Sequence, residues 1–530
     1  MTSTSSAGPA AGAGTVARTP WGDARGVELG AVRVWRGLPY AVAPVGAARL
    51  RPPRPPEPWT GERDCSAFGP TSPQLRLPGL RAPGRRGRAP RGCEDCLYLN
   101  VWSPGPGGPG RPVLVWIHGG GFVSGAGSSF DGARLAARGD AVVITVNYRL
   151  GPWGHLALAP DSTAPPAGAD PAPQDPGTAG DPAPGAPGAG EQGAGEQGAD
   201  EQGADNLALL DQVAALRWVR AAVAAFGGDP GRVTVFGESA GAVYLGALLA
   251  TPAARGLFHR AVLQSGTADR LRGPRDADHA RRRFEELLGR APAEASTTDL
   301  VRAGEALLAE TAQPFGPTAD GALLPADPVA AVAAGSCRDV PLLVTWCRDE
   351  MELFLTLAPD VVPAAEEARL RAAVGDDRWE RLLTRYAEVH GARARSTLLT
   401  DWAFARPAQR LADAARAAGG RVWALRFDHP GAGGTVPHGA DLPLTWVRAE
   451  AASPDPARRV AALWQDALLA FATTGDPATP ALPPWPRHEP TSRPVLLLSA
   501  APRVAEHLHD DLDAGWPAPP ATTSTPKRVG

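Results

Sequence analysis

The stretch that decides the fold is Val233–Gly241, VTVFGESAG, which leads directly into the alanine- and leucine-rich run Ala242–Ala250. The β-branched and aromatic residues at its start predict a strand, and the run that follows predicts a helix. A Gly-x-Ser-x-Gly sequence between a strand and a helix is typical of a tight turn that exposes the serine hydroxyl. The stretch therefore predicts Ser239 as a nucleophile and the N–H of Ala240 as a donor to an oxyanion.

A second glycine-rich stretch follows another apolar strand. His118–Phe122, HGGGF, comes directly after the β-branched run Val113–Ile117. Consecutive glycines let backbone amides approach a substrate oxygen with no side chain between them. Gly120 and Gly121 are the predicted donors that complete the oxyanion hole with Ala240.

Strands and helices alternate along most of the chain. Alternation of this kind predicts a mostly parallel central β-sheet with helices on both faces, an α/β fold. The helices are expected at 206–226 and 457–473, where apolar residues recur at three- and four-residue steps. The predicted strands are Leu97–Trp102, Val113–Ile117, Ala141–Tyr148, Val233–Phe236, Ala261–Leu263, Pro341–Trp346, Val422–Phe427 and Val495–Leu498.

One segment does not fit this alternation. From about 160 to 205 the chain is rich in Pro, Gly, Ala and Asp and ends in repeats of Glu-Gln-Gly-Ala, so it cannot bury enough apolar surface to offset its ordering entropy. We expect a disordered insertion in a single domain that spans residues 15–515, with disordered tails at 1–14 and 516–530. The insertion is either a loop that drifted in sequence or a lid over the site.

Composition excludes several other classes of protein. The 530 residues carry a formal net charge of −3, and no basic face of the kind that binds nucleic acid is evident. No apolar run reaches the length of a membrane span, and the first residues show no secretory signal, so a cytoplasmic protein is expected. No metal-binding or cofactor motif is present, because Cys93 and Cys96 form an isolated C-x-x-C that we interpret as structural or incidental.

Longer runs of sequence resemble the type-B carboxylesterase and cholinesterase-like family of α/β-hydrolases. The resemblance covers residues 15–515 apart from the insertion, and it implies the α/β-hydrolase fold and a catalytic order of serine, acid and histidine. The runs that carry it are Phe226–Gly241 (FGGDPGRVTVFGESAG), Glu94–Trp102 (EDCLYLNVW), Arg36–Ala41 (RGLPYA) and Asn147–Gly151 (NYRLG).

The resemblance also implies the other two members of a triad. Arg348–Met351, RDEM, looks like the family's acid motif and assigns the acid to Glu350, with Asp349 as the alternative because methionine stands where the family has glycine. Pro437–Pro443, PHGADLP, looks like the histidine loop and assigns the base to His438. His429 lacks the following Gly-x-Asp-Leu and is interpreted as a surface or packing histidine.

Two supporting roles and one departure follow from the same comparison. Glu238 is similar to a family glutamate near the site, or else has a structural role, and Ser265 resembles a serine that supports the triad behind the histidine. Relatives commonly pair a cysteine at Cys96 with one at the position of Ser72, so that disulfide is not expected here. A disulfide that uses Cys65 instead stays an open alternative.

These observations predict a serine esterase that acts on small to medium, largely apolar esters through an acyl-enzyme, without metal or cofactor. Amides, carbamates, thioesters or lactones would be cleaved by the same residues, and a non-catalytic binding protein of the same fold is the alternative from another class. Oligomeric state is left open. Candidate pocket-wall residues are Phe122, Trp153, Trp346, Phe354, Trp402 and Phe404.

Overall fold

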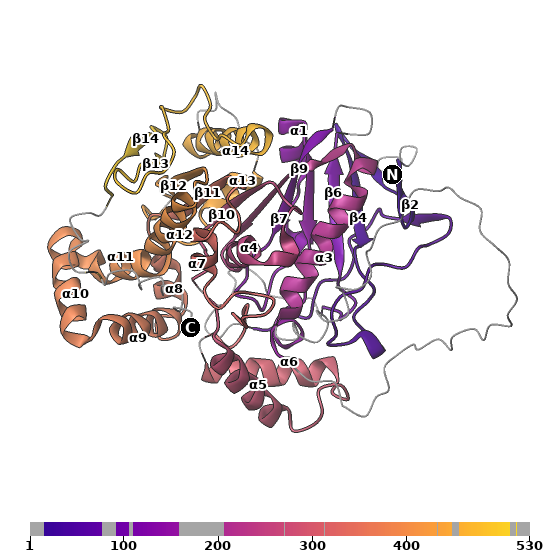
Figure 1. Cartoon of the computed structure of the whole chain (residues 1–530), viewed down its shortest axis with the longest axis horizontal. Coiled ribbons are helices and arrows are strands. Elements are labelled where there is room, and N and C mark those ends of the chain that lie inside the picture. The colour runs from indigo at the N-terminus through magenta and orange to yellow at the C-terminus, as the bar shows by residue number, and fades with distance from the viewer. Residues whose placement is uncertain are drawn as a thin grey trace, which may run out of the picture.

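A large twisted sheet forms the centre of the molecule (Figure 1). The computed structural model describes residues 15–76, 92–104, 110–157, 206–269, 271–311, 313–431, 433–447, 455–508 and 516. Within them the chain forms an 11-stranded sheet in the order β14-β13-β12-β11-β10-β9-β7-β8-β6-β4-β3 and a 3-stranded sheet in the order β1-β2-β5. The central run of the large sheet, from β13 to β8, is parallel. The edge strands β14, β6, β4 and β3 are antiparallel.

The parallel run confirms the strands predicted from β-branched sequence, which appear as β7 to β13, with the predicted strand before them as β6. The strands are β1 (Val16–Thr19), β2 (Gly22–Arg25), β3 (Val27–Leu29), β4 (Val32–Pro39), β5 (Glu62–Asp64), β6 (Tyr98–Ser103), β7 (Arg111–Ile117), β8 (Val142–Val146), β9 (Gly228–Glu238), β10 (Arg260–Gln264), β11 (Leu342–Cys347), β12 (Val422–Phe427), β13 (Val495–Leu498) and β14 (Arg503–Ala505).

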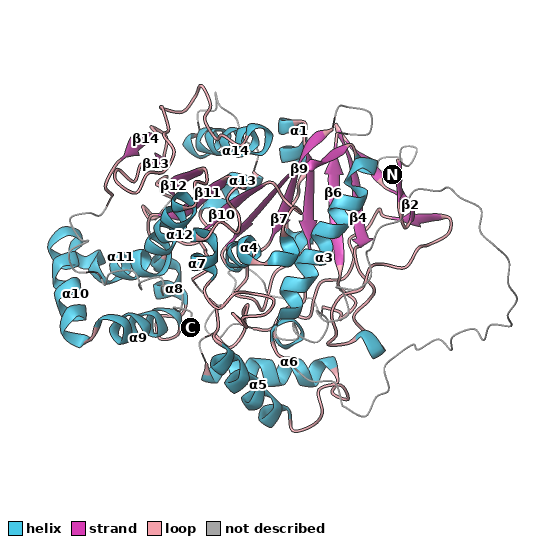
Figure 2. Ribbon diagram, in the orientation of Figure 1, coloured by secondary structure: helices cyan, strands magenta, loops and turns pink. Residues whose placement is uncertain are grey.

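Helices cover both faces of the sheet (Figure 2). Successive side chains of a strand point to opposite faces, so Val113 and Val115 of β7 enter one apolar core with α3, α4, α7 and α12. Leu114 and Trp116 of the same strand enter the other core, with α1, α13 and α14. The predicted helices at 206–226 and 457–473 are confirmed as α3, which a short 3₁₀ turn extends, and α14.

Apart from the short α2, which packs on α3, the remaining helices form two groups outside these layers. Figure 1 shows α5 and α6 side by side at one edge of the molecule and α8 to α11 together at another. The helices are α1 (Ala133–Gly139), α2 (Pro152–His155), α3 (Leu207–Ala222), α4 (Ala240–Ala250), α5 (Pro274–Leu288), α6 (Thr297–Glu310), α7 (Pro328–Ala333), α8 (Met351–Leu357), α9 (Val362–Val374), α10 (Asp376–His390), α11 (Ala394–Thr400), α12 (Arg406–Ala417), α13 (Asp441–Trp446) and α14 (Pro456–Thr474).

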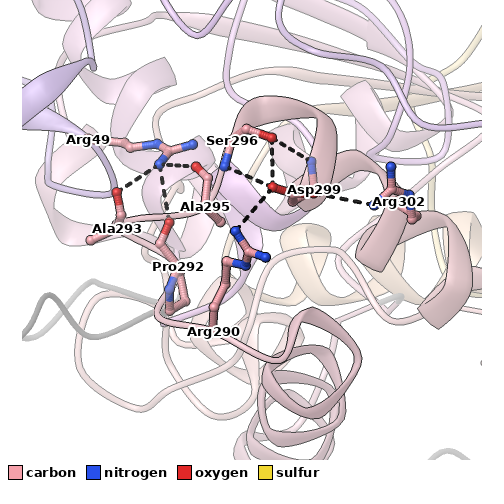
Figure 3. A network of polar contacts seen from close by, with 8 residues as sticks. All are labelled: Arg49, Arg290, Pro292, Ala293, Ala295, Ser296, Asp299 and Arg302. Carbon is pink, nitrogen blue, oxygen red and sulfur yellow. Dashed lines mark hydrogen bonds and ion pairs between the residues drawn. The ribbon is translucent and has the colours of Figure 1, made fainter.

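A single arginine ties the loop between α5 and α6 to the N-terminal part of the chain (Figure 3). Nη1 of Arg49 donates to the carbonyl oxygens of Pro292, Ala293 and Ala295 at 3.2, 3.1 and 2.8 Å. The other two guanidinium nitrogens donate to the carboxylate of Glu94, each at 2.7 Å. Since backbone carbonyls in a loop have no strand partner, this charge-assisted clamp fixes the loop's position.

All five cysteines are free thiols. Ser72 hydrogen-bonds to the buried thiol of Cys96 and accepts a hydrogen bond from the N–H of Leu150 at 3.1 Å. Burial raises the pKa of the Cys65 thiol to about 11 and that of the Cys96 thiol further still. Serine at position 72 leaves the relatives' pairing with Cys96 without its second sulfur, and in the structure Cys65 and Cys96 are both buried free thiols.

The predicted insertion at about 160–205 and the predicted tail at 1–14 lie outside the described residues, as does residue 517 onward. Trp516, which the sequence analysis assigned to the disordered C-terminal tail, is an exception. Its ring stacks on that of Trp402 at 6.1 Å between centroids, and only 7% of its surface is exposed. A packed aromatic residue thus lies just past the predicted domain boundary at 515, and the boundary itself stays a prediction.

Candidate active site

Ser239 lies at the sharp turn between β9 and α4. Its backbone angles are φ 56° and ψ −124°, a conformation that non-glycine residues rarely adopt and that costs about 1–3 kcal/mol. The turn is held from both sides, because the Ser239 N–H donates to the carbonyl of Gln264 at 2.8 Å and its carbonyl accepts from the N–H of Val243 at 3.0 Å. A Cβ on Gly241 would lie 2.1 Å from the carbonyl oxygen of Ile117, so only glycine fits there.

The turn brings Ser239 to a histidine and a glutamate from two other loops. Nε2 of His438 lies 2.9 Å from Oγ of Ser239, and Nδ1 of the same ring lies 2.7 Å from Oε2 of Glu350. Glu350 follows β11 and is fully buried, and His438 precedes α13. The three residues predicted from the resemblance are thus connected by hydrogen bonds in the order serine, histidine, glutamate.

Glu350 and Asp349, the two candidates for the catalytic acid, have different contacts. The second oxygen of Glu350 accepts from the N–H of Cys347 at 2.7 Å, so its carboxylate is held at both oxygens. Asp349 accepts from the N–H of Val436 at 2.9 Å and from Arg348 at 3.0 Å, and so ties the histidine loop to the acid loop. Asp349 is therefore not the acid partner of His438.

Two further buried carboxylates surround the imidazole. Oε1 of Glu238 lies 3.2 Å from Nε2 of His438, and Asp441 accepts a hydrogen bond from Gln264 at 2.5 Å. Burial raises the pKa of Glu238 to about 8 and that of Asp441 to about 6. Burial alone would lower the pKa of His438, but the charges of Glu238 and Glu350 outweigh it and raise that pKa to about 9. The imidazole and Glu238 therefore shift each other's pKa: the carboxylate raises that of His438, and the imidazolium opposes the rise in that of Glu238.

The glycine loop after β7 lies beside Ser239. Gly120 and Gly121 have positive φ angles of 118° and 61°, and a Cβ on Gly120 would lie 2.1 Å from the carbonyl oxygen of Ser124. Neither glycine N–H has a hydrogen-bond partner among the described residues. Ala240 opens α4, so its N–H has no partner within the helix. These donors are available to a substrate oxygen.

The glycine loop rests on buried aromatic residues. Nδ1 of His118 donates to the carbonyl of Gly119 at 2.8 Å, and the hydroxyl of Tyr148 donates to the carbonyl of His118 at 2.7 Å. The two rings stack with centroids 4.4 Å apart. Burial lowers the pKa of His118 to about 4, so its imidazole stays neutral and keeps its donor at neutral pH.

A cavity of about 460 Å³ opens over Ser239. Among the described residues, the charged or titratable side chains at its wall are Glu238 and His438 of the site itself, and the rest of the wall is mostly apolar. Other lining residues are Gly120, Gly121, Phe122, Ala240, Val243, Ser265, Gly266, Leu308, Gln313, Pro314, Phe315, Leu353, Phe354, Val362, Phe404, Gly439 and Leu442. A cavity of this size and polarity accommodates small to medium apolar groups.

The predicted pocket wall is half right. Phe122, Phe354 and Phe404 line the cavity. Trp153 and Trp346 do not, because both are buried in the core beside the sheet, and Trp402 packs against Trp516 instead. Residues that the sequence analysis missed include Leu308, Phe315 and Leu353, which come from segments with no motif.

The other residues singled out from the sequence, Glu238, His429 and Ser265, differ in how they are placed relative to the triad and the cavity. Glu238 contacts the histidine, whereas His429 does not line the cavity. Ser265 lines the cavity, but its hydroxyl has no hydrogen-bond partner among the described residues, so its supporting role stays a prediction. The described residues contain no group of His, Cys, Asp and Glu that could hold a metal ion, and none of their helices has the length and apolarity of a membrane span.

Comparison with known proteins agrees with this geometry. The model of the carboxylesterase family matches residues 13–166 and 196–516. A para-nitrobenzyl esterase of Bacillus subtilis is 35% identical over 92% of this chain and 95% of its own. A phenmedipham hydrolase of Pseudarthrobacter oxydans is 34% identical over 91% of this chain and 94% of its own.

Solved structures show the same likeness. A Geobacillus stearothermophilus carboxylesterase, 34% identical, superposes with a TM-score of 0.77 over 95% of this chain and all of its own. The expected mostly parallel sheet flanked by helices is thus the one these enzymes share. The chain belongs to the carboxylesterase family and has the α/β-hydrolase fold.

Proposed function

We propose that this enzyme hydrolyses small to medium, largely apolar carboxylic esters through an acyl-enzyme formed on Ser239. The observation that carries the proposal is the unbroken series of contacts from Ser239 through His438 to Glu350, at 2.9 and 2.7 Å. A serine hydroxyl is a weak nucleophile until a base accepts its proton, and this series supplies that base.

In the proposed first half-reaction, Ser239 attacks the ester carbonyl while His438 takes its proton. Glu350 keeps the Nδ1 proton in place, so that Nε2 is free to accept, and it stabilises the imidazolium that forms. The N–H groups of Gly120, Gly121 and Ala240 bind the oxyanion, and each such donor typically contributes about 10²- to 10³-fold to turnover. His438 then protonates the leaving alcohol.

In the second half-reaction, water takes the place of the alcohol and the same groups act again. His438 removes a proton from the water as the water oxygen attacks the acyl carbonyl. The bond between the acyl carbon and Oγ of Ser239 then breaks, His438 returns the proton to that Oγ, and the acid is released. No group beyond these side chains and amides takes part in the proposed cycle. The apolar cavity wall supports the proposed preference for apolar esters.

The direct test is hydrolysis of p-nitrophenyl acetate by the wild-type protein and the Ser239→Ala variant. Turnover should fall by roughly 10⁴- to 10⁶-fold in the variant, because both the nucleophile and the acyl-enzyme are lost. A variant that retains the parental rate would show that another group carries out the reaction. A non-catalytic binding protein would show no turnover in the wild type and no labelling by a fluorophosphonate.

Other scissile bonds belong in the same assay. Amides, carbamates, thioesters and lactones would use the same residues, and the match to a phenmedipham hydrolase makes phenmedipham a second substrate to include. Higher kcat/KM for that compound than for any simple ester would replace esters as the proposed main substrates. A cytoplasmic location stays a prediction from the sequence.

A further inference from the structure

The geometry of the proposed reaction divides the cavity into an acyl side and an alcohol side. The tetrahedral carbon carries four groups: Oγ of Ser239, the oxyanion, the alcohol oxygen and the acyl chain. The oxyanion faces the glycine loop, and the alcohol oxygen faces His438, which must protonate it. Phe354 and Phe404 lie against that ring, with centroids 5.1 and 5.2 Å from it, and so form the alcohol side.

The acyl chain takes the direction that remains. We assign the acyl side to lining residues other than the two rings that pack on His438, namely Val243, Gly266, Leu308, Pro314 and Phe315. Pro314 and Phe315 belong to an irregular segment, residues 313–320, between α6 and α7. We call this segment the acyl wall. The segment belongs to no named strand or helix, and its backbone forms an isolated bridge with Arg272 at Thr318, so side-chain contacts add to what fixes its position.

One buried arginine holds the acyl wall. Arg272 is only 5% exposed, and its guanidinium donates to the carbonyls of Pro314 at 2.7 Å and Gly316 at 3.0 Å. It also donates to the hydroxyl of Thr318 at 2.8 Å and to the carbonyl of His155 at 2.5 Å. The clamp therefore joins the acyl wall to the segment that carries His155.

That segment supports the glycine loop. The ring of His155 lies edge-on to that of Phe122, with centroids 5.7 Å apart, and Phe122 directly follows the oxyanion glycines. Gly316 of the acyl wall faces the ring of Phe122, since a Cβ added to that glycine would lie 3.4 Å from the ring. Arg272 thus sets the separation between the acyl wall and the residue beside the oxyanion hole.

Two further observations define the role. Arg272 does not itself line the cavity over Ser239, so any effect on substrate passes through the wall. The backbone of Arg272 pairs with the same segment, donating to the carbonyl of Pro317 and accepting from Ala319, both at 2.9 Å. Asn206 pins Thr318 from the other direction, at 2.8 and 2.9 Å.

We infer that Arg272 is a positioning residue that determines which acyl groups the enzyme accepts, by fixing the acyl wall, residues 313–320, against Phe122. The inference rests on the proposed function and adds to it the residue that controls acyl size. With the guanidinium removed, the wall relaxes outward. Bulky acyl groups then gain in kcat/KM relative to acetyl, while preference among alcohols is unchanged.

The test compares two ester pairs in the Arg272→Met and Thr318→Val variants. Methionine keeps an unbranched apolar side chain without donors, and valine replaces the Thr318 hydroxyl at nearly constant volume. The ratio of kcat/KM for p-nitrophenyl benzoate to that for the acetate should rise by about tenfold in Arg272→Met and by about threefold in Thr318→Val. The ratio for 1-naphthyl acetate to p-nitrophenyl acetate should stay within about twofold in both.

Arg49→Met is the matched control. Arg49 also clamps an irregular loop through several carbonyl oxygens, but that loop lies between α5 and α6 and does not line the cavity (Figure 3). The Arg49→Met variant should have a lower melting temperature, with the acyl ratio and the alcohol ratio of kcat/KM each within about twofold of the wild type.

An acyl ratio that stays unchanged in soluble Arg272→Met overturns the inference, as does an equal shift in Arg49→Met. If Arg272→Met does not fold, an unchanged acyl ratio in Thr318→Val overturns it alone. Each protein is first titrated with a fluorophosphonate. A wild-type enzyme that does not label contradicts the proposed function, whereas normal labelling with an unchanged acyl ratio contradicts only the role of Arg272.

Discussion

Replacing Glu350 by glutamine keeps the size of the side chain and changes only its charge and the hydrogen-bonding capacity of its two terminal atoms. Oε1 accepts from the Cys347 N–H at 2.7 Å and Oε2 from His438 Nδ1 at 2.7 Å, so both sites require an acceptor. Glutamine has one acceptor and one donor end. Since the Cys347 N–H is buried and cannot change, we expect the amide oxygen to face it and the NH₂ group to face His438.

That orientation forces the wrong tautomer on His438. Nδ1 must then accept a hydrogen bond, so the ring proton moves to Nε2, which points at Oγ of Ser239 and can no longer take its proton. Loss of the correct tautomer and of the carboxylate charge costs about 10⁴-fold in kcat. This corresponds to roughly 5 kcal/mol of transition-state stabilisation.

The assay is steady-state hydrolysis of p-nitrophenyl acetate by Glu350→Gln, with circular dichroism to verify the fold. Asp349→Asn is the control, because Asp349 contacts Val436 and Arg348 and not the imidazole. It should stay within about tenfold of the wild type in kcat, since only the position of the loop is affected. A Glu350→Gln enzyme within tenfold of the wild type, or an Asp349→Asn enzyme with the larger loss, would refute this assignment of the acid.

Three further predictions concern the surroundings of the site. Glu238→Gln should move the acidic limb of the kcat/KM profile to lower pH, because Glu238 helps raise the pKa of His438 to about 9 and only the neutral imidazole acts as a base; a profile that does not move would exclude this coupling. Gly241→Ala should cost about 3 kcal/mol or more in urea unfolding, because its Cβ would lie 2.1 Å from the carbonyl of Ile117, and a neutral effect would show that the turn can widen. Dithiothreitol should leave the melting temperature unchanged, since all five cysteines are free, and a drop would reveal a disulfide.

The local parts of the site could be predicted from the sequence because residues that are neighbours in the chain determine their geometry. Close backbone contacts require glycine on both sides of Ser239 and at Gly119 and Gly120, and Gly121 has a positive φ of 61°. The partners of the serine are different. His438 is 199 residues from Ser239 and 88 from Glu350, so only resemblance to a family could pair them.

The choice between Asp349 and Glu350 shows where sequence reasoning ends. The two acids are adjacent, and which one faces the imidazole depends on how the chain turns from β11 into α8. The same limit applies to the cavity. Trp346 lies on β11 and is buried in the core, while Phe315 lies in a segment with no periodic pattern and lines the cavity. In both cases the direction in which the side chain points decides the role: which acid faces His438, and which aromatic residue lines the cavity.

The helices outside the sheet layers were missed for a related reason. In α10 the buried residues are Trp379, Leu382 and Tyr386, a narrow stripe on a helix that is otherwise charged. Such a helix gains most of its stability from packing against neighbours far away in sequence, here α9 and α11. Its apolar residues do recur at three- and four-residue steps, so the sequence carries a signal for this helix but not for the neighbours that it packs against.

The central claim is that His438 and Glu350 activate Ser239, and mapping the site of covalent modification tests it most directly. The protein is treated with a fluorophosphonate, digested and analysed by mass spectrometry, alongside His438→Ala. The account predicts stoichiometric modification of Ser239 in the wild type and a rate of labelling reduced by several powers of ten in the variant. Modification of a different residue, or equal labelling rates in the two proteins, would contradict it.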